Sequence, residues 1–221
     1  MRITGIVPMR HYSERVPGKN YRNFGGIPLY HHVIKALEAT PEIDQVVIDT
    51  DSPFILNEAP KVFPNVIILE RPENLRDGDI PMNEVLLNTI TNLESDFFLQ
   101  THSTNPLLKS STISQGLNEF LNNQDIYDSL FSVTRLQARL WDQNVKAVNH
   151  DPAVLLRTQD LPPIFEENSC MYLFSGSSLR ESGNRIVQKP LMFEMDPEEA
   201  VDIDVESDFR LAEFLYRERM K

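Results

Sequence analysis

The sequence predicts an α/β fold with a mainly parallel, Rossmann-like sheet in three layers, because short apolar runs alternate with segments of helical periodicity. The runs expected as buried strands are residues 3–7, 44–49, 66–69, 96–99, 130–134, 171–174 and 201–204. The helical patterns cover residues 29–37, 54–59, 83–93, 113–121 and 208–220. Ligands of such sheets bind outside the carboxyl ends of the strands, so the loops after Val7, Ile48 and Leu99 are expected to share one crevice.

Length and composition fit one domain over residues 1–221. The chain has 221 residues, of which 41% are hydrophobic, and no linker or repeat divides it. Two short apolar runs, at 145–148 and 154–156, are separated by Asn149-His-Asp-Pro152 and predict a hairpin. We therefore expect a small excursion from the domain around residues 135–165.

The charge and the cysteine content exclude several classes of protein. A net charge of −12 argues against a general nucleic-acid binder, which needs a basic face. Cys170 is the sole cysteine, so an internal disulfide is impossible. No apolar run approaches the roughly 20 residues that span a bilayer, and no signal-peptide pattern is present. We expect a cytoplasmic protein that binds neither nucleic acid nor membrane.

The loop after the first strand is basic although the protein is acidic. It holds Arg10, Ser13, Arg15, Lys19 and Asn20. It is neither a P-loop nor a dinucleotide fingerprint, because the glycine patterns of both are missing. A basic loop between a strand and a helix is either a solvated turn or a site that offers cations and backbone N–H groups to a polyanion such as a triphosphate.

This loop resembles a known nucleotide-binding motif. Its pattern, Ile-Val-Pro-x-Arg-x-x-Ser-x-Arg-Val-Pro-Gly-Lys-Asn, is similar to that of the sugar-acid cytidylyltransferases, which include the acylneuraminate (CMP-sialic acid) synthetases and the CMP-Kdo synthetases. The resemblance implies a nucleotide-diphospho-sugar transferase type of fold and CTP as a substrate. It also implies that Arg10, Ser13, Arg15, Lys19 and Asn20 bind the nucleotide, with Arg10 and Lys19 also catalytic.

A second feature is the pair Asp202 and Asp204. Residues two apart in a strand face the same side, so both carboxylates could hold one cation, although the pair could equally sit at a strand end or cap the next helix. The longer string Val-Asp-Ile-Asp-Val-Glu-Ser-Asp-Phe-Arg-Leu-Ala-Glu213 resembles the closing signature of the same family. It implies Mg²⁺ bound by Asp202 and Asp204, with Asp204 as a catalytic residue.

Three middle segments resemble the family near the nucleotide, and they imply contacts from Asp51, Arg71, His102 and Thr104. Arg71 could instead bridge a surface acid. His102 stands where the acylneuraminate enzymes have a glutamine, and Gln100 could serve in its place. Glu14 stands where those enzymes have lysine. These two departures leave open whether the chain prefers CTP or GTP.

The segment Arg157-Thr-Gln-Asp-Leu-Pro-Pro, followed by Asn168 and Tyr172, resembles the family's sugar-site region. It implies that Arg157, Gln159, Asn168 and Tyr172 bind a sugar acid, with the Arg157 guanidinium as a partner for its carboxylate. Family members are usually homodimers whose excursion reaches toward the neighbour's pocket, so a homodimer is implied as well.

The resemblance as a whole implies a nucleotidyltransferase that joins CTP and a nonulosonic, sialic-type sugar acid into a CMP-sugar and releases pyrophosphate. Two alternatives stay open from the residues themselves. One is a glycosyltransferase that uses Asp202-x-Asp204 to hold the metal of a nucleotide-sugar, and the other is a non-catalytic module that binds a nucleotide or a sugar.

Overall fold

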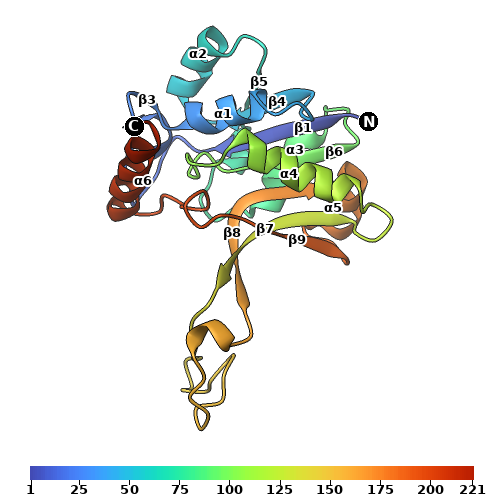
Figure 1. Cartoon of the computed structure of the whole chain (residues 1–221). Coiled ribbons are helices and arrows are strands. Elements are labelled where there is room, and N and C mark those ends of the chain that lie inside the picture. Colours follow the sequence, from blue (N-terminus) through green and yellow to red (C-terminus); the bar gives the residue numbers. More distant parts are fainter.

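A computed structural model describes all residues from 1 to 221 and shows one seven-stranded sheet flanked by helices (Figure 1). The strands are β1 (Ile3–Met9), β4 (Gln45–Thr50), β5 (Ile67–Glu70), β6 (Phe97–Gln100), β7 (Ser129–Leu136), β8 (Ile164–Phe174) and β9 (Pro190–Glu194), and β2 (Asn23–Phe24) and β3 (Ile27–Pro28) form a separate pair. The helices are α1 (Tyr30–Glu38), α2 (Pro53–Val62), α3 (Met82–Ile90), α4 (Ser110–Leu121), α5 (Gly176–Ser182) and α6 (Glu206–Arg219). Short 3₁₀ turns cover Lys19–Tyr21, Glu73–Leu75 and Thr158–Asp160.

The sheet is mainly parallel, which confirms the predicted fold class. Its strand order is β5-β4-β1-β6-β8-β7-β9. The strands β5, β4, β1 and β6 run parallel, whereas β8 is antiparallel to both of its neighbours, and β9 is parallel to β7. The carboxyl ends of β1, β4, β5 and β6 therefore meet at one edge.

Helices cover both faces of the sheet. On β1, Val7 and Met9 belong to a core of 25 buried residues that also takes side chains from α1, α2 and α4. Ile6, which directly precedes Val7, points to the other face and joins a smaller core with Leu86 of α3 and Leu179 of α5. Burial on both faces explains why these strands are continuous apolar runs in the sequence.

The first strand, β1, continues through Pro8 to Met9, whereas the sequence predicted that it ends at Val7. The register of β1 with β6 stops at Ile6, opposite Gln100, but its register with β4 continues to Met9. The Ile6 carbonyl accepts from Thr101 on the β6 side, so the missing N–H of Pro8, two residues on, faces the same side beyond the end of β6. Proline is tolerated there because no ladder hydrogen bond is lost.

Two other expectations of strands were wrong. Residues 201–204 form a loop, in which the Ile203 N–H donates to the Thr104 carbonyl in place of a strand ladder. The edge strand is instead β9. Residues 145–148 and 154–156 form no hairpin strands, and the pairing in this region is an isolated bridge between Trp141 and Ala147. Apolar side chains such as Leu155 are exposed here, so burial does not stabilise a strand.

The strands β7 and β8 leave the sheet together as a two-stranded ribbon (Figure 1). We call the part of the chain between them, residues 137–163, the arm tip, and the ribbon with its tip the arm. The arm projects well away from the sheet and its helices.

None of the helices combines the length and the apolar composition that a membrane-spanning helix needs.

Candidate active site

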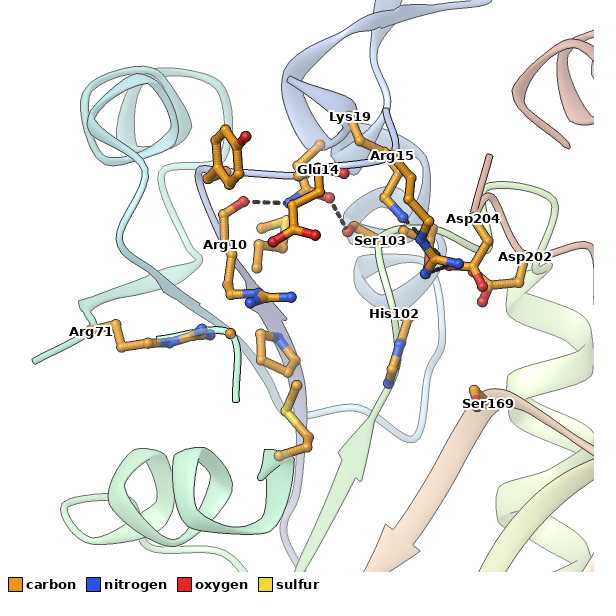
Figure 2. Close-up of a pocket in the computed structure, with 18 of the residues that line it drawn as sticks. Arg10, Glu14, Arg15, Lys19, Arg71, His102, Ser103, Ser169, Asp202 and Asp204 are labelled. Carbon is orange, nitrogen blue, oxygen red and sulfur yellow. Dashed lines mark hydrogen bonds and ion pairs between the residues drawn. The ribbon is translucent and has the colours of Figure 1, made fainter. Parts of the chain in front are cut away.

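A polar cavity of about 530 Å³ opens at the carboxyl ends of β1, β5 and β6 (Figure 2). Only three of its 19 lining residues are hydrophobic. Its charged or ionisable lining residues are Arg10, Glu14, Arg15, Lys19, Arg71, Asp79, His102, Asp202 and Asp204. The structure thus brings together residues from the first loop, the middle segments and the Asp202-x-Asp204 pair, which are far apart in sequence. We call this cavity the main cavity.

The first loop is fastened to the exit of β6. The amide nitrogen of Asn20 donates to the Arg10 carbonyl at 2.7 Å, and the Ser103 hydroxyl donates to the Asn20 amide oxygen at 2.7 Å. Gly18 allows the chain to turn here, because its φ is +65°. Asn20 lines the main cavity, but both ends of its amide are used within the protein, so the structure gives it a bracing role.

Asp51 lies outside the main cavity. Its carboxylate accepts from the His11 N–H at 2.7 Å, and the His11 ring bonds the Ser52 hydroxyl at 2.9 Å. Asp51 and Ser52 therefore brace the first loop from the end of β4. Ser52 also caps α2, as its position before Pro53 indicates.

The cations of the first loop differ in their protein partners. Arg15 pairs with Asp204 at 2.8 Å, and the Lys19 ammonium donates to the Ile203 carbonyl at 2.5 Å and lies 3.9 Å from Asp204. Burial lowers the pKa of Lys19, against the opposing effect of Asp202 and Asp204. Arg10 pairs with no acid, and its guanidinium lies so close to Gly78 that a Cβ there would be 2.7 Å from Nη1. Arg10 is thus a cation without a protein counter-ion.

Asp202 and Asp204 also differ from each other in their protein partners. Burial raises the pKa of Asp202, and its Oδ1 is buried without a hydrogen-bond partner. Asp204 is more exposed, and its backbone N–H donates to the Asp208 carboxylate at 3.0 Å, which fixes it at the start of α6. No third acidic, histidine or cysteine side chain completes a protein cluster of metal ligands. Two carboxylate groups beside a cationic cavity are the kind of set that holds Mg²⁺ together with phosphates.

Arg71 is buried and paired with a buried acid, so the expected bridge to a surface acid was wrong. Its Nε donates to Asp49 at 2.6 Å, and both side chains are at most 2% exposed. The Thr89 hydroxyl of α3 donates to the other Asp49 oxygen at 2.7 Å. Arg71 also lines the main cavity, so its ion pair with Asp49 fixes the guanidinium at the edge of that cavity. An acidic residue inside a predicted buried strand, here Asp49, indicates a buried partner, but no such partner was predicted from the sequence.

A second cavity of about 420 Å³ adjoins the first and shares Ser169, Asp202 and Asp204 with it. Asn168 lies here, but its amide is occupied by the Ser132 hydroxyl at 2.6 Å and the Thr134 hydroxyl at 3.0 Å. Ser169 has a φ of +60°, a left-handed conformation that is uncommon for a residue with a side chain.

The residues expected to bind a sugar are split between two places. Arg157 and Gln159 are exposed on the arm tip, where Arg157 pairs with Asp160 at 2.7 Å, and neither lines the main cavity or the second cavity. Tyr172 is buried on β8, and its hydroxyl donates to Glu167 at 2.5 Å. Arg185 lies over the Tyr172 ring, and the sequence analysis missed it because no motif marks its loop.

Solved structures of two nucleotide-dependent synthetases show the same fold as this mainly parallel sheet. One is a CMP:2-keto-3-deoxy-manno-octonic acid synthetase complexed with CTP, with a TM-score of 0.71 at 12% identity, covering 99% of this chain and 100% of that one. Another is a 4-diphosphocytidyl-2C-methyl-D-erythritol synthase, with a TM-score of 0.69 at 13% identity, covering 97% and 98% of the two chains. At these identities the likeness concerns the fold alone.

The chain belongs to the cytidylyltransferase family, whose model matches residues 4–220. It is 28% identical over 218 residues to N-acylneuraminate cytidylyltransferase A of Danio rerio, covering 96% of this chain and 50% of that protein. It is 26% identical over 225 residues to pseudaminic acid cytidylyltransferase of Campylobacter jejuni, covering 96% and 95%. The chain thus spans about half the length of the Danio rerio relative and nearly all of the Campylobacter one. The resemblance found in the sequence is confirmed.

Proposed function

We propose that the chain transfers CMP from CTP to a nonulosonic sugar acid and releases pyrophosphate. The observation that carries this proposal is the main cavity of about 530 Å³, whose lining combines the cations of one loop with two carboxylates. The names of the relatives, which are cytidylyltransferases of N-acylneuraminate and of pseudaminic acid, support the choice of substrates.

The cations of the first loop would bind the triphosphate. Arg10 has no counter-ion in the protein, and Arg15 and Lys19 are held by a single exposed acid, Asp204. An arriving triphosphate can take over Arg15 and Lys19 because it carries more negative charge than one carboxylate. Ser13 lines the main cavity beside them and can donate its hydroxyl.

The anomeric oxygen of the sugar acid would then attack the α-phosphorus in line, and pyrophosphate would leave. The new bond joins that oxygen to phosphorus, and the bond that breaks joins phosphorus to the oxygen bridging the α- and β-phosphates. This step requires alignment and neutralisation of charge more than a covalent intermediate with the protein. Arg10 and Lys19 would stabilise the charge that develops on the phosphates.

Asp202 and Asp204 would hold Mg²⁺. The buried, unpartnered Oδ1 of Asp202 fits a missing ligand, and Asp204 becomes available once the triphosphate engages Arg15. When bound, the metal would neutralise phosphate charge and polarise the attacked phosphorus. A hydrogen bond from the Thr104 side chain opposes the rise in the pKa of Asp202, so Thr104 helps to keep this carboxylate charged.

The sugar acid would lie where the two cavities join, near Asn168, Ser169 and Tyr172. Arg157 and Gln159 of the same chain line neither cavity, because they are on the arm tip, which projects away from the sheet (Figure 1). We therefore propose a homodimer in which Arg157 of the partner subunit reaches the second cavity. The exposed Trp141 and Leu155 on the arm tip are apolar surface that such a contact would cover.

Pyrophosphate release tests the proposed function. The purified chain is mixed with Mg²⁺ and, in turn, CTP, GTP, UTP or ATP against N-acetylneuraminate, legionaminate, pseudaminate or Kdo. Release confined to CTP and one or two related acids is the expected result, and release confined to GTP would correct the base and retain the reaction. Silence in every combination, with no nucleotide raising the melting temperature, would refute nucleotide binding at the first loop.

A further inference from the structure

A polar relay lies beneath the main cavity, on the face of the sheet covered by α3 and α5. Gln100 of β6 and Tyr172 of β8 are directly opposite each other in the antiparallel register, so their side chains lie together. The Arg185 guanidinium covers both: its Cζ is 3.6 Å from the centre of the Tyr172 ring, and its Nη1 donates to Gln100 Oε1 at 2.5 Å. Gln100 in turn contacts His102, which lines the main cavity.

The direction of the hydrogen bonds in this relay is determined by Arg185. A guanidinium can only donate, so the Gln100 oxygen must face Arg185, and the Gln100 NH₂ group must face His102. That NH₂ group lies 2.5 Å from His102 Nε2 and donates to it. Nε2 must therefore carry a lone pair, and the ring proton of a neutral His102 must be on Nδ1.

The ring is also held neutral. Burial, with Arg185 and Lys19 nearby, lowers the pKa of His102 to about 4. The protein offers Nδ1 no hydrogen-bond partner, and this nitrogen is not one of the buried, unpaired atoms, so it is reached from the main cavity. Any acceptor placed beside it would find an uncharged N–H donor of fixed direction.

The position of His102 indicates which substrate it meets. In Figure 2, Arg10 and Arg71 lie on one side of His102, and Asp202, Asp204 and Ser169 lie on the other. Tyr172 of the relay is on β8, the strand that carries Ser169, and Ser169 lines both cavities. The donor therefore stands in the main cavity between Arg71 and Ser169, the residue through which this cavity adjoins the second one.

We propose that Arg185, acting through Gln100, is a positioning residue that holds His102 as a neutral Nδ1–H donor for an acceptor oxygen of the sugar acid. The second part of this inference rests on the proposed function, whereas the state of the His102 ring does not. The two parts can therefore be tested separately.

The ring state is measured by nitrogen NMR of the unliganded chain, in which the two neutral tautomers of histidine have different spectra. The His102→Gln variant identifies the His102 signals among those of the five histidines. The expected result at neutral pH is the Nδ1–H form. Gln100→Glu provides the opposite case, because a carboxylate can only accept and would draw a proton onto Nε2. A wild-type ring in the Nε2–H form, or a Gln100→Glu ring that keeps an unprotonated Nε2, would overturn the relay.

Steady-state kinetics test which substrate the His102 Nδ1–H group contacts. We expect Arg185→Gln to raise the KM for the sugar acid about three- to tenfold, which is the worth of one hydrogen bond, and to change the KM for CTP less than about twofold. Arg185→Lys keeps a donor beside Gln100 and should restore most of the loss. Lys189→Gln removes an exposed cation a few residues along and should change neither KM. An equal rise in both KM values, or no rescue by lysine, would contradict the inference.

These outcomes separate the two proposals. A chain that turns over no sugar acid but shows the Nδ1–H ring would contradict the proposed function and the substrate contact, and would leave the relay intact. A chain that turns over a sugar acid with His102 in the Nε2–H form would contradict the relay alone.

Discussion

The parallel half of the sheet and the arm hold their polar residues in different ways. In the parallel half, side chains at the main cavity are held by others behind them: Asn20 by Ser103, and Arg71 by Asp49 at 2.6 Å. On the arm tip, Arg157 is exposed and pairs only with Asp160, three residues away. The side chains at the main cavity are thus held in place before a ligand arrives, whereas Arg157 is held only by one exposed neighbour in sequence.

This difference separates two tasks of the proposed reaction. Alignment of a triphosphate demands fixed cations, and the bracing residues of the parallel half supply them. The carboxylate of the sugar acid is left to Arg157, which under the proposed dimer becomes ordered only against a second subunit.

The largest effect is expected from Asp204→Ala. Loss of this carboxylate removes a proposed metal ligand and the counter-ion of Arg15, so turnover should fall by at least about a hundredfold. The measurement is pyrophosphate release under saturating Mg²⁺, with Asp125→Ala, which removes an exposed acid far from the site, as the control. Undiminished turnover of Asp204→Ala would refute the role of the metal.

A large loss of stability is expected from Asp49→Asn. This change leaves the Arg71 charge buried and unpaired, which costs about 3–5 kcal/mol and lowers the melting temperature by roughly 10 °C. Arg157→Ala should leave the melting temperature unchanged because its ion pair with Asp160 is exposed. Equal melting temperatures for both variants would show that the parallel half is no more rigidly built than the arm.

A mixing experiment tests the arm. Arg157→Ala should lower kcat/KM for the sugar acid about tenfold or more, by loss of a charged hydrogen bond. If the site is shared between subunits, co-expression of Arg157→Ala with Asp204→Ala should restore about a quarter of the wild-type activity, since half of the dimers then hold one intact site. Activity that stays at the level of the single variants would show that the arm does not serve a partner's site.

The smallest effect is expected from Glu14→Gln. Glu14 is an exposed acid in the main cavity, where it would repel the proposed triphosphate. Its removal should lower the KM for CTP about two- to threefold, and high salt should reduce the difference because it screens exposed charges. A higher KM for CTP would show instead that Glu14 makes a favourable contact with the nucleotide.

The sequence predicted the fold and much of the main cavity, because buried strands and basic loops leave local patterns. The basic loop after Val7 could be placed at the carboxyl edge of a sheet without coordinates, whereas the pair Asp202-x-Asp204 was connected to the same ligand only by resemblance. The loop at 201–204 was predicted as a strand because alternating apolar and acidic residues occur both in strands and in loops. Only the course of the chain past the end of β6 distinguishes a loop from a strand here.

Other residues could not be found from local patterns. Arg185 acts through a cross-strand pair of Gln100 and Tyr172, 72 positions apart in the register that joins them, and no spacing rule connects such residues. The distance of Arg157 from its own cavity depends on how far β7 and β8 extend beyond the sheet.

The most direct test of the central claim is to follow atoms through one turnover. The sugar acid carries heavy oxygen at the anomeric position, and CTP carries separate radiolabels at the α- and γ-phosphates. The account predicts that the α-label and the heavy oxygen both appear in the CMP-sugar, and that the γ-label appears in pyrophosphate. Heavy oxygen in a phosphate product, or the γ-label released as single phosphate by the chain alone, would contradict attack by the sugar acid on the α-phosphorus.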